Sequence, residues 1–253
     1  MRKYDYDRIA EIYEILELDG RSETVEMNDF LHSLFKCRDL STVVDFTCGT
    51  GAQAVGLARR GYKVTASDLN SSMLQVARKK GRGLRIRFFE NDIREARLGK
   101  FDAAISMYNA VGHLSESGFR KAIRNVSKNM NSGGLFIFDI FNLDFMANGG
   151  AREFEYLDIV HEQAGTHYVR ISKNRFDVNK GIIRVNNKVY VQKGAKKPDI
   201  FHQKWDMKIY SRDQLSVLLR ENGFSRFQFH AGPNKKFIRK TSSSILVVAQ
   251  RNE

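Results

Sequence analysis

The sequence predicts an α/β fold in which a doubly wound parallel sheet is interrupted by an inserted antiparallel sheet. Three observations support this prediction. Between residues 41 and 141, short apolar runs alternate with stretches of helical periodicity. A glycine turn, Gly49-x-Gly51, follows the first of these runs. From about residue 151, apolar residues instead recur at every second position, as in strands with one solvated face.

Five apolar runs have the length and composition of strands covered on both faces of a parallel sheet. They are "STVVDF" (41–46), "GYKVTASD" (61–68), "LRIRFFEND" (84–92), "FDAAISM" (101–107) and "GGLFIFDIF" (133–141). Helical stretches separate them, at residues 52–61, 71–81 and 117–130. Strands and helices that alternate in this way predict βαβ units with right-handed crossovers.

The segments outside this alternation define three regions. Two helical stretches, roughly 5–18 and 23–37, precede the first strand, and residues 1–40 are expected to cover the carboxyl edge of the sheet or a bound ligand. Residues 151–210 are expected to form the inserted antiparallel subdomain. Residues 41–150 and 211–253 form the core, where "SRDQLSVLLRENG" begins a helix with a Ser211/Gln214 capping box and two closing strands follow.

Composition sets limits on function without deciding it. The 253 residues include 42 Lys and Arg against 29 Asp and Glu, a net charge of +13, and residues 78–87 and 233–240 concentrate the cations. Such an excess suits a polyanion, so RNA is kept as a possible partner. Cys37 and Cys48 lack a metal-ligand spacing, and no metal is expected. We expect a cytoplasmic protein without a signal peptide or membrane helix, and its oligomeric state is not predicted.

Three of the predicted strands deliver an acid to one edge of the sheet, the carboxyl edge where open α/β sheets bind ligands. These acids are Asp45, Asp68 and Asp92. The glycine turn alone also fits a dinucleotide site. Asp45 beside that turn would repel a pyrophosphate but suits a cationic centre such as a sulfonium. Asp68 can accept both hydroxyls of a ribose, and Asp92 can accept a hydrogen bond from an adenine amino group.

Five segments in order resemble the motifs of class I S-adenosylmethionine-dependent methyltransferases of the small-molecule type with a β insertion. They are "VVDFTCGTG", "VTASDLNSSML", "FFENDI", "FDAAISMYNAVGHL" and "MNSGGLFIFDIFN". The resemblance implies a seven-stranded Rossmann-like sheet of order 3-2-1-4-5-7-6, with the seventh strand antiparallel. It implies S-adenosyl-L-methionine as cofactor, with S-adenosyl-L-homocysteine as product. One departure is Thr47, where the family often has glycine, and its side chain is expected to narrow the methionyl pocket.

The resemblance assigns roles by position. Asp45, Thr47 and the turn from Gly49 through Thr50 to Gly51 are expected near the methionyl part. Asp68 is expected at the ribose, with Leu69 against the adenine. Asp92 and Ile93 are expected at the adenine edge, and Met107 beside the cofactor.

The acceptor side is less defined by the sequence. Asn109 and His113, after the fourth strand, are candidate acceptor contacts, and His113 is also a candidate general base or a packing residue. Tyr13 is a candidate contact to cofactor or acceptor. Tyr168, Tyr190 and Trp205 either line a substrate wall or fill a core.

These features favour methyl transfer to a nitrogen or oxygen of a small molecule by in-line displacement. The alternatives are an RNA methyltransferase of the same fold, a noncatalytic cofactor-binding protein and, least favoured, a nicotinamide-dependent oxidoreductase. No RNA-binding module of interleaved aromatic and basic residues is apparent in the sequence.

Overall fold

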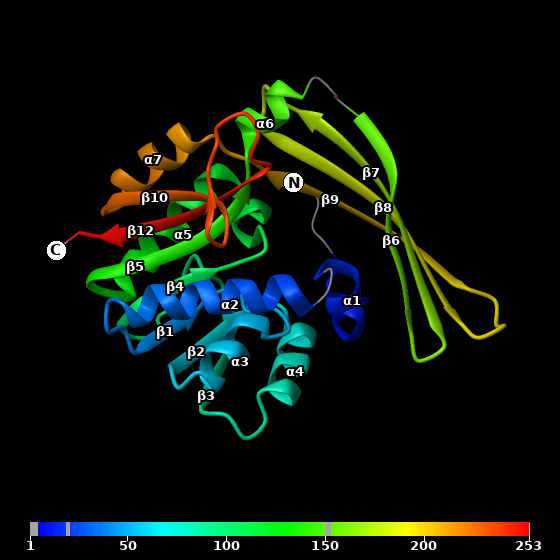
Figure 1. Cartoon of the computed structure of the whole chain (residues 1–253), viewed down its shortest axis with the longest axis horizontal. Helices are drawn as coiled ribbons and strands as arrows, with labels where there is room; N and C mark the ends of the chain where they lie inside the picture. The colour runs from blue at the N-terminus through cyan, green and yellow to red at the C-terminus, as the bar shows by residue number, and fades with distance from the viewer. Residues whose placement is uncertain (1–4, 19–20, 150–152, 253) are drawn as a thin grey trace.

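The computed structural model of the chain describes residues 5–18, 21–149 and 153–252. The strands form two separate sheets (Figure 1). The larger sheet has the order β11-β10-β12-β5-β4-β1-β2-β3, and the smaller has the order β6-β7-β8-β9. The strands of the large sheet are β1 (Thr42–Asp45), β2 (Lys63–Asp68), β3 (Ile86–Glu90), β4 (Phe101–Ser106), β5 (Met130–Phe141), β10 (Phe224–Gly232), β11 (Lys235–Lys236) and β12 (Ser244–Arg251).

The large sheet confirms the expected order. Strands β3, β2, β1, β4 and β5 are mutually parallel, and β12 pairs antiparallel with β5. Strand β10 then pairs antiparallel with β12. Counting β12 as the seventh core strand and β10 as the sixth gives 3-2-1-4-5-7-6. The two-residue β11 at the outer edge is an addition that the sequence did not predict.

Helices cover the large sheet on both faces because its strands are apolar at successive positions. The helices are α2 (Arg21–Lys36), α3 (Ala52–Arg59), α4 (Ser71–Lys80), α5 (Glu116–Lys128) and α7 (Arg212–Arg220). Val43 of β1 packs in a cluster with side chains of α2, α3 and α4, whereas the adjacent Val44 packs in a cluster with α5 and α7. The Ser211/Gln214 capping box is present at the start of α7. Short elements complete the core: η2 (Ala110–His113) and α6 (Leu143–Asn148).

The inserted sheet comprises β6 (Glu153–Gln163), β7 (Thr166–Asp177), β8 (Ile182–Lys193) and β9 (Asp199–Lys208). All its pairings are antiparallel, and buried residues alternate with exposed or half-buried ones along β8 and β9. One face therefore packs inward, as the period of two predicted. This sheet extends away from the core beside α1 (Figure 1).

The N-terminal segment, residues 5–18, lies between the core and the inserted sheet. It contains η1 (Ala10–Ile12) and α1 (Tyr13–Glu17). Ile9 and Leu16 are fully buried in an apolar cluster with side chains of the inserted sheet, including Val189 and Trp205. The segment thus shares its hydrophobic core with the inserted sheet rather than with the large sheet.

Candidate active site

Two adjoining cavities open at the carboxyl edge of the large sheet. The smaller has a volume of about 370 Å³ and lies over the glycine turn and the ends of β2 and β4. The larger has a volume of about 580 Å³ and lies between the core and the inner face of the inserted sheet. Four side chains line both cavities and so mark the boundary between them: Tyr6, Tyr13, Tyr108 and His113.

The glycine turn forms the floor of the smaller cavity. Gly49 and Gly51 have φ angles of +50° and +83°, in the left-handed region that favours glycine. A Cβ on Gly51 would lie 3.2 Å from the Cβ of Ala77, so the turn also packs closely against α4. Gly49, Thr50 and Thr47 line the cavity, whereas Gly51 does not. The expected contribution of Gly51 is therefore to the shape of the turn.

Asp68 ties the end of β2 to this turn. Its Oδ2 accepts a hydrogen bond from the Gly49 N–H (2.8 Å), and its Oδ1 accepts one from the Asn70 N–H (2.9 Å). Burial raises the pKa of Asp68 above its ordinary value. Each carboxylate oxygen has a second lone pair, so both oxygens can still accept a hydrogen bond from a ligand. Leu69, which is 62% exposed, lies next to it at the cavity wall.

Asp92 and Ile93 line the cavity beyond β3. The Nε of Arg94 donates to both carboxylate oxygens of Asp92 at 2.9 Å, and the Arg94 N–H donates to Oδ1 at 2.8 Å. Asp92 therefore already has a cationic partner in its own loop. A ligand amino group that approaches Asp92 has to share the carboxylate with Arg94, which also lines the cavity.

Asp45 departs from the sequence expectation. Its carboxyl is 2% exposed and does not line either cavity. Burial raises the pKa of Asp45 to about 8, an effect reinforced by the nearby Asp68, while the Thr47 N–H donates to its Oδ1 (3.3 Å) and opposes the rise. At neutral pH the carboxyl is mostly protonated, and the hydrogen bond from the Thr47 N–H ties it to the start of the turn. The three expected acids thus separate into two that line the cavity and one that is buried and lines neither cavity.

The residues after β4 form the boundary in an unusual backbone conformation. Tyr108 and Asn109 have φ angles of +61° and +56°, which are uncommon for residues other than glycine and often occur at functional sites. The Tyr108 hydroxyl lies 3.0 Å from Thr24 Oγ1 and accepts a hydrogen bond from Gln53 Nε2 (2.9 Å). Met107 lines the smaller cavity, and Asn109 lines the larger one.

His113 and Tyr6 meet at the boundary. The Tyr6 hydroxyl lies 3.1 Å from Nε2 of His113, and their rings are in edge contact. Burial lowers the pKa of His113 to about 4 and raises the pKa of Tyr6 well above its ordinary value. Both groups are therefore neutral at physiological pH. Tyr13 lies beside Tyr6, with their ring centroids 6.0 Å apart.

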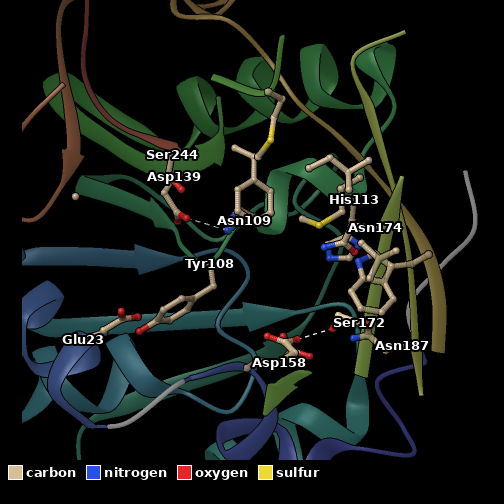
Figure 2. A pocket seen from close by; sticks show the side chains of 18 of the residues that line it. Glu23, Tyr108, Asn109, His113, Asp139, Asp158, Ser172, Asn174, Asn187 and Ser244 are labelled. Carbon is tan, nitrogen blue, oxygen red and sulfur yellow. Dashed lines mark hydrogen bonds between the residues drawn. The ribbon is translucent and has the colours of Figure 1, made fainter. Parts of the chain in front are cut away.

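Asp139 faces the larger cavity from the end of β5. Its Oδ2 accepts the N–H of Asn109 (3.1 Å), whereas its Oδ1 is buried and has no hydrogen-bond partner among the described residues. Burial raises the pKa of Asp139 to about 6. Figure 2 shows Asp139 and Asn109 together on the core side of the cavity, opposite the side chains of the inserted sheet. An acid inside the apolar run "LFIFDIF" was the sequence signal for this residue.

Ionic contacts hold the N-terminal segment over both cavities. Glu14 accepts a hydrogen bond from Thr50 Oγ1 (2.6 Å) and forms an ion pair with Lys80. Glu11 pairs with Lys79 at 2.7 Å. On the other side, Glu17 pairs with Arg170 of the inserted sheet at 2.6 Å. Part of the basic run 78–87 thus fastens this segment.

The smaller cavity suits S-adenosylmethionine in the chemistry of its lining. Asp68 offers two acceptor oxygens for a pair of ribose hydroxyls, and apolar side chains such as Leu69 and Ile93 flank it. The glycine turn leaves its backbone accessible at Gly49. These groups match a nucleoside better than a pyrophosphate, because the Asp68 carboxylate is hydrogen-bonded to the turn at Gly49.

Comparisons with known proteins agree with this geometry. Residues 43–134 match the family described as "Methyltransferase domain". Human glycine N-methyltransferase is 26% identical over 208 residues, which cover 75% of this chain and 67% of that protein. Residues 43–134 thus form a methyltransferase domain.

Solved structures extend the likeness across the whole methyltransferase. An S-adenosylmethionine-dependent methyltransferase from Clostridium acetobutylicum superimposes with a TM-score of 0.81 at 21% identity, covering 98% of this chain and 99% of that one. An S-adenosylmethionine-bound amino pentose methyltransferase from Micromonospora echinaspora gives a TM-score of 0.73 at 22% identity, covering 92% and 93%. The shared fold therefore includes the inserted sheet as well as the core.

Only one of the three aromatic residues that the sequence offered as a substrate wall lines a cavity. Trp205 lines the larger cavity of the methyltransferase, whereas Tyr168 and Tyr190 line neither cavity. Phe154, Tyr156 and Phe176, which sequence reasoning did not single out, do line the larger one. Tyr6 was also missed, although its spacing of seven residues from Tyr13 is a helical repeat that could have drawn attention to it.

Two further features of the sequence can be compared with the structure: the second basic run, residues 233–240, and the expected lack of a membrane helix. In the second basic run, Arg239 pairs with Asp144 of α6 (2.8 Å) and Asp213 of α7 (3.1 Å), so it connects these two helices at the surface. Across the described residues of the methyltransferase, none of the helices combines the length and hydrophobicity needed to cross a bilayer.

Proposed function

We propose that this methyltransferase methylates the amino nitrogen of a small molecule bound in the larger cavity. The observation that supports this most strongly is Asp139, which lines that cavity and whose buried Oδ1 has no hydrogen-bond partner among the described residues. An ammonium or amine is the complementary donor. Two of the relatives whose printed names specify nitrogen or amino acceptors, glycine N-methyltransferase and the amino pentose methyltransferase, support the same proposal.

The charge of the larger cavity favours a cationic acceptor. Glu23, Glu26 and Asp139 line it and form no ion pair within the described part of the chain. Arg170 also lines it, but Glu17 and Asp158 neutralise that guanidinium, at 2.6 and 2.7 Å. Lys235 is the one further cation among the lining residues. An amine, which is protonated in water, therefore gains from entering this cavity, whereas a phosphate-bearing polymer does not.

We assign the cofactor contacts to the residues of the smaller cavity. Asp68 would bind the ribose hydroxyls, Leu69 would contact the adenine, and Asp92 with Ile93 would lie at the adenine edge. Thr47, Gly49, Thr50 and Met107 would surround the methionyl part. Bound S-adenosylmethionine supplies a methyl group made electrophilic by its sulfonium, so the protein contributes mainly position and proton control.

Proton control is assigned to Asp139. An ammonium has no free lone pair, so it must lose a proton before its nitrogen can accept a methyl group. With a pKa of about 6, Asp139 is ionised above that pH and is a stronger base than an ordinary carboxylate. It would hold the ammonium and receive its proton. His113, neutral because its pKa is about 4, would fix the Tyr6 hydroxyl at the boundary without adding a positive charge.

A transfer assay with methyl-labelled S-adenosylmethionine tests this proposal. The acceptors are small primary amines, the corresponding alcohols, and total RNA. Labelled amines, with no product from alcohols or RNA, are expected. Label in RNA, or in the alcohols alone, would contradict the proposal and favour the alternatives. Stabilisation by S-adenosylmethionine without transfer to any acceptor would point to a noncatalytic protein.

A further inference from the structure

A belt of polar side chains crosses the inner face of the inserted sheet. Ser172 on β7 lies opposite Asn187 on β8, which lies opposite Gln203 on β9. All three are buried, with 2–3% of their surface exposed. The flanking inward residues of β8, Val185 and Val189, belong to the apolar cluster of the sheet. The polar belt therefore interrupts a face that otherwise packs as a hydrophobic core.

Two amides of this region have unused hydrogen-bonding capacity towards the larger cavity. Asn187 Oδ1 and Asn174 Oδ1 are buried and have no hydrogen-bond partner among the described residues, and both residues line the cavity. Buried polar atoms are nearly always paired because an unpaired one forfeits its hydration. Their position on a cavity wall indicates that a ligand provides the missing donors.

The unpaired atoms on both walls of the larger cavity are all hydrogen-bond acceptors. Asp139 and Asn109 line the cavity from the core, Asn174 and Asn187 line it from the inserted sheet, and the Oδ1 of each is buried without a partner among the described residues. All four are acceptors, so the complementary ligand donates hydrogen bonds in two directions. Figure 2 shows the two pairs on opposite sides of the cavity. A ligand with a single amino group bound to Asp139 leaves the amide oxygens of Asn174 and Asn187 without hydrogen-bond donors.

Aromatic side chains adjoin these amides. Phe154 and Phe176 stack with ring centroids 5.4 Å apart and planes inclined by 23°, and both line the cavity. Trp205 lines it from β9, in the row of the sheet that contains Asn174. This wall therefore presents an apolar surface beside hydrogen-bond acceptors. A saturated ring with hydroxyl groups at its edge has the matching pattern.

We propose that Asn187, together with Asn174, forms a second recognition site that selects acceptors bearing a hydroxyl group on the same ring as the amine. This inference rests on the proposed amine methylation and assigns specificity to the inserted sheet. The hydroxyl donates to the amide oxygens while the amine occupies Asp139. An amine without a hydroxyl leaves the amides unpaired and so binds less well.

The test compares 2-aminocyclohexanol with cyclohexylamine as acceptors at saturating S-adenosylmethionine. The wild-type ratio of their kcat/KM values is expected to favour the hydroxylated amine. Asn187→Leu should reduce this ratio by about 10- to 100-fold, while the rate with cyclohexylamine is retained. Asn187→Asp keeps an acceptor oxygen and should preserve the ratio. Because each variant is assayed with both amines, their different intrinsic reactivity cancels.

Asn186→Leu is the matched control. Asn186 is the adjacent residue of β8, is half-buried and lines a hollow on the other face of the sheet. It should leave the ratio unchanged. An unchanged ratio in Asn187→Leu, or an equal loss in Asn186→Leu, would overturn the proposal.

Binding separates this inference from the proposed function. Calorimetric titration of both amines into the protein with S-adenosylhomocysteine does not require turnover. If neither amine is methylated but wild type binds 2-aminocyclohexanol more tightly than Asn187→Leu does, the proposed function fails and the recognition site stands. If both amines are methylated without preference, the recognition site fails alone.

Discussion

The two cavities of the methyltransferase are assembled from the chain in different ways. Most of the smaller cavity comes from residues 46–115, in successive turns at the ends of parallel strands. The larger cavity takes side chains from α2, the end of β5, the β10–β11 turn and all four strands of the inserted sheet. The N-terminal segment is shared. The smaller cavity, the proposed cofactor side, is thus a local property of the sheet edge, whereas the larger cavity, the proposed acceptor side, depends on how distant segments pack.

Because the two cavities are built from different segments, substitutions at one cavity are expected to leave the binding properties of the other unchanged. A substitution on the cofactor side should alter S-adenosylmethionine binding for every acceptor. One on the acceptor side should alter turnover and selectivity at constant cofactor affinity. Each variant below tests whether the separation holds.

The largest effect is expected for Asp68→Ala. It removes the proposed acceptors of the ribose hydroxyls and the partner of the Gly49 N–H, and hydrogen bonds to a charged group are worth about 1.5–3 kcal/mol each. The cofactor Kd should rise by about 100-fold or more, measured by calorimetry. Glu90→Ala is the control, because Glu90 pairs with Asp68 in register but is exposed and lines neither cavity. Wild-type affinity in Asp68→Ala would refute the assignment.

Asp139→Asn should have the next largest effect, on the other side. Loss of a positioned base typically costs about 10²- to 10⁴-fold, so kcat/KM for the amine should fall by about 100-fold or more. The cofactor Kd should remain at its wild-type value. A large change in that Kd would show that the two cavities are not separable at this residue.

The pH dependence provides a related prediction. The pKa of Asp139 is about 6, and the ionised form is the active one, so kcat/KM for the amine should fall about tenfold per pH unit below pH 6. His113 should add no inflection near 6.5, because its pKa is about 4. Two results would contradict the role of Asp139. The first is a wild-type kcat/KM that does not fall below pH 6, and the second is the same fall in Asp139→Asn.

Asp45→Asn should change stability more than binding. Folding raises the pKa of Asp45 to about 8, so the stability supplied by its protonated form is complete below pH 4 and is lost as the pH rises through 8. The asparagine variant avoids this loss, so its free energy of unfolding should fall less than that of the wild type between pH 5 and pH 9. Denaturant unfolding at pH 5 and pH 9 measures the difference. If Asp45→Asn is instead destabilised at pH 9 and loses cofactor binding, Asp45 contributes directly to the cofactor site.

The smallest effect is expected for Glu14→Gln. Glu14 connects the N-terminal segment to Thr50 and Lys80, so its loss should speed cofactor dissociation by about 3- to 5-fold, since a partly exposed ion pair contributes about 1 kcal/mol or less. Lys79→Met breaks the more exposed pair with Glu11 and should have no measurable effect. Stopped-flow dissociation distinguishes the two. Equal effects would mean that the segment as a whole, rather than Glu14, controls release.

Sequence reasoning identified several residues that line the smaller cavity, because these residues follow recognisable strand ends. Asp68, Leu69, Asp92 and Ile93 lie at the cavity because the carboxyl ends of parallel strands meet at one edge. Asp45, the last residue of β1, also lies at that edge, but its side chain is buried and lines neither cavity. Position along a strand does not reveal whether a side chain reaches a cavity or is buried beside it.

The acceptor side could be predicted only in part. Asn109 and His113 were found because they follow β4, and Tyr13 because its segment precedes the sheet. Asp139, Asn174 and Asn187 were not, since their importance depends on the inserted sheet facing the end of β5. No local pattern encodes that long-range packing.

The most direct test of the central claim is to identify the atom methylated in 2-aminocyclohexanol, which carries both an amine and a hydroxyl. Mass spectrometry and NMR of the product distinguish the two outcomes. We predict N-methyl product alone from the wild-type protein and about 100-fold less of it from Asp139→Asn. O-methyl product, or N-methyl product formed equally well by Asp139→Asn, would contradict the claim that Asp139 makes the larger cavity an amine site.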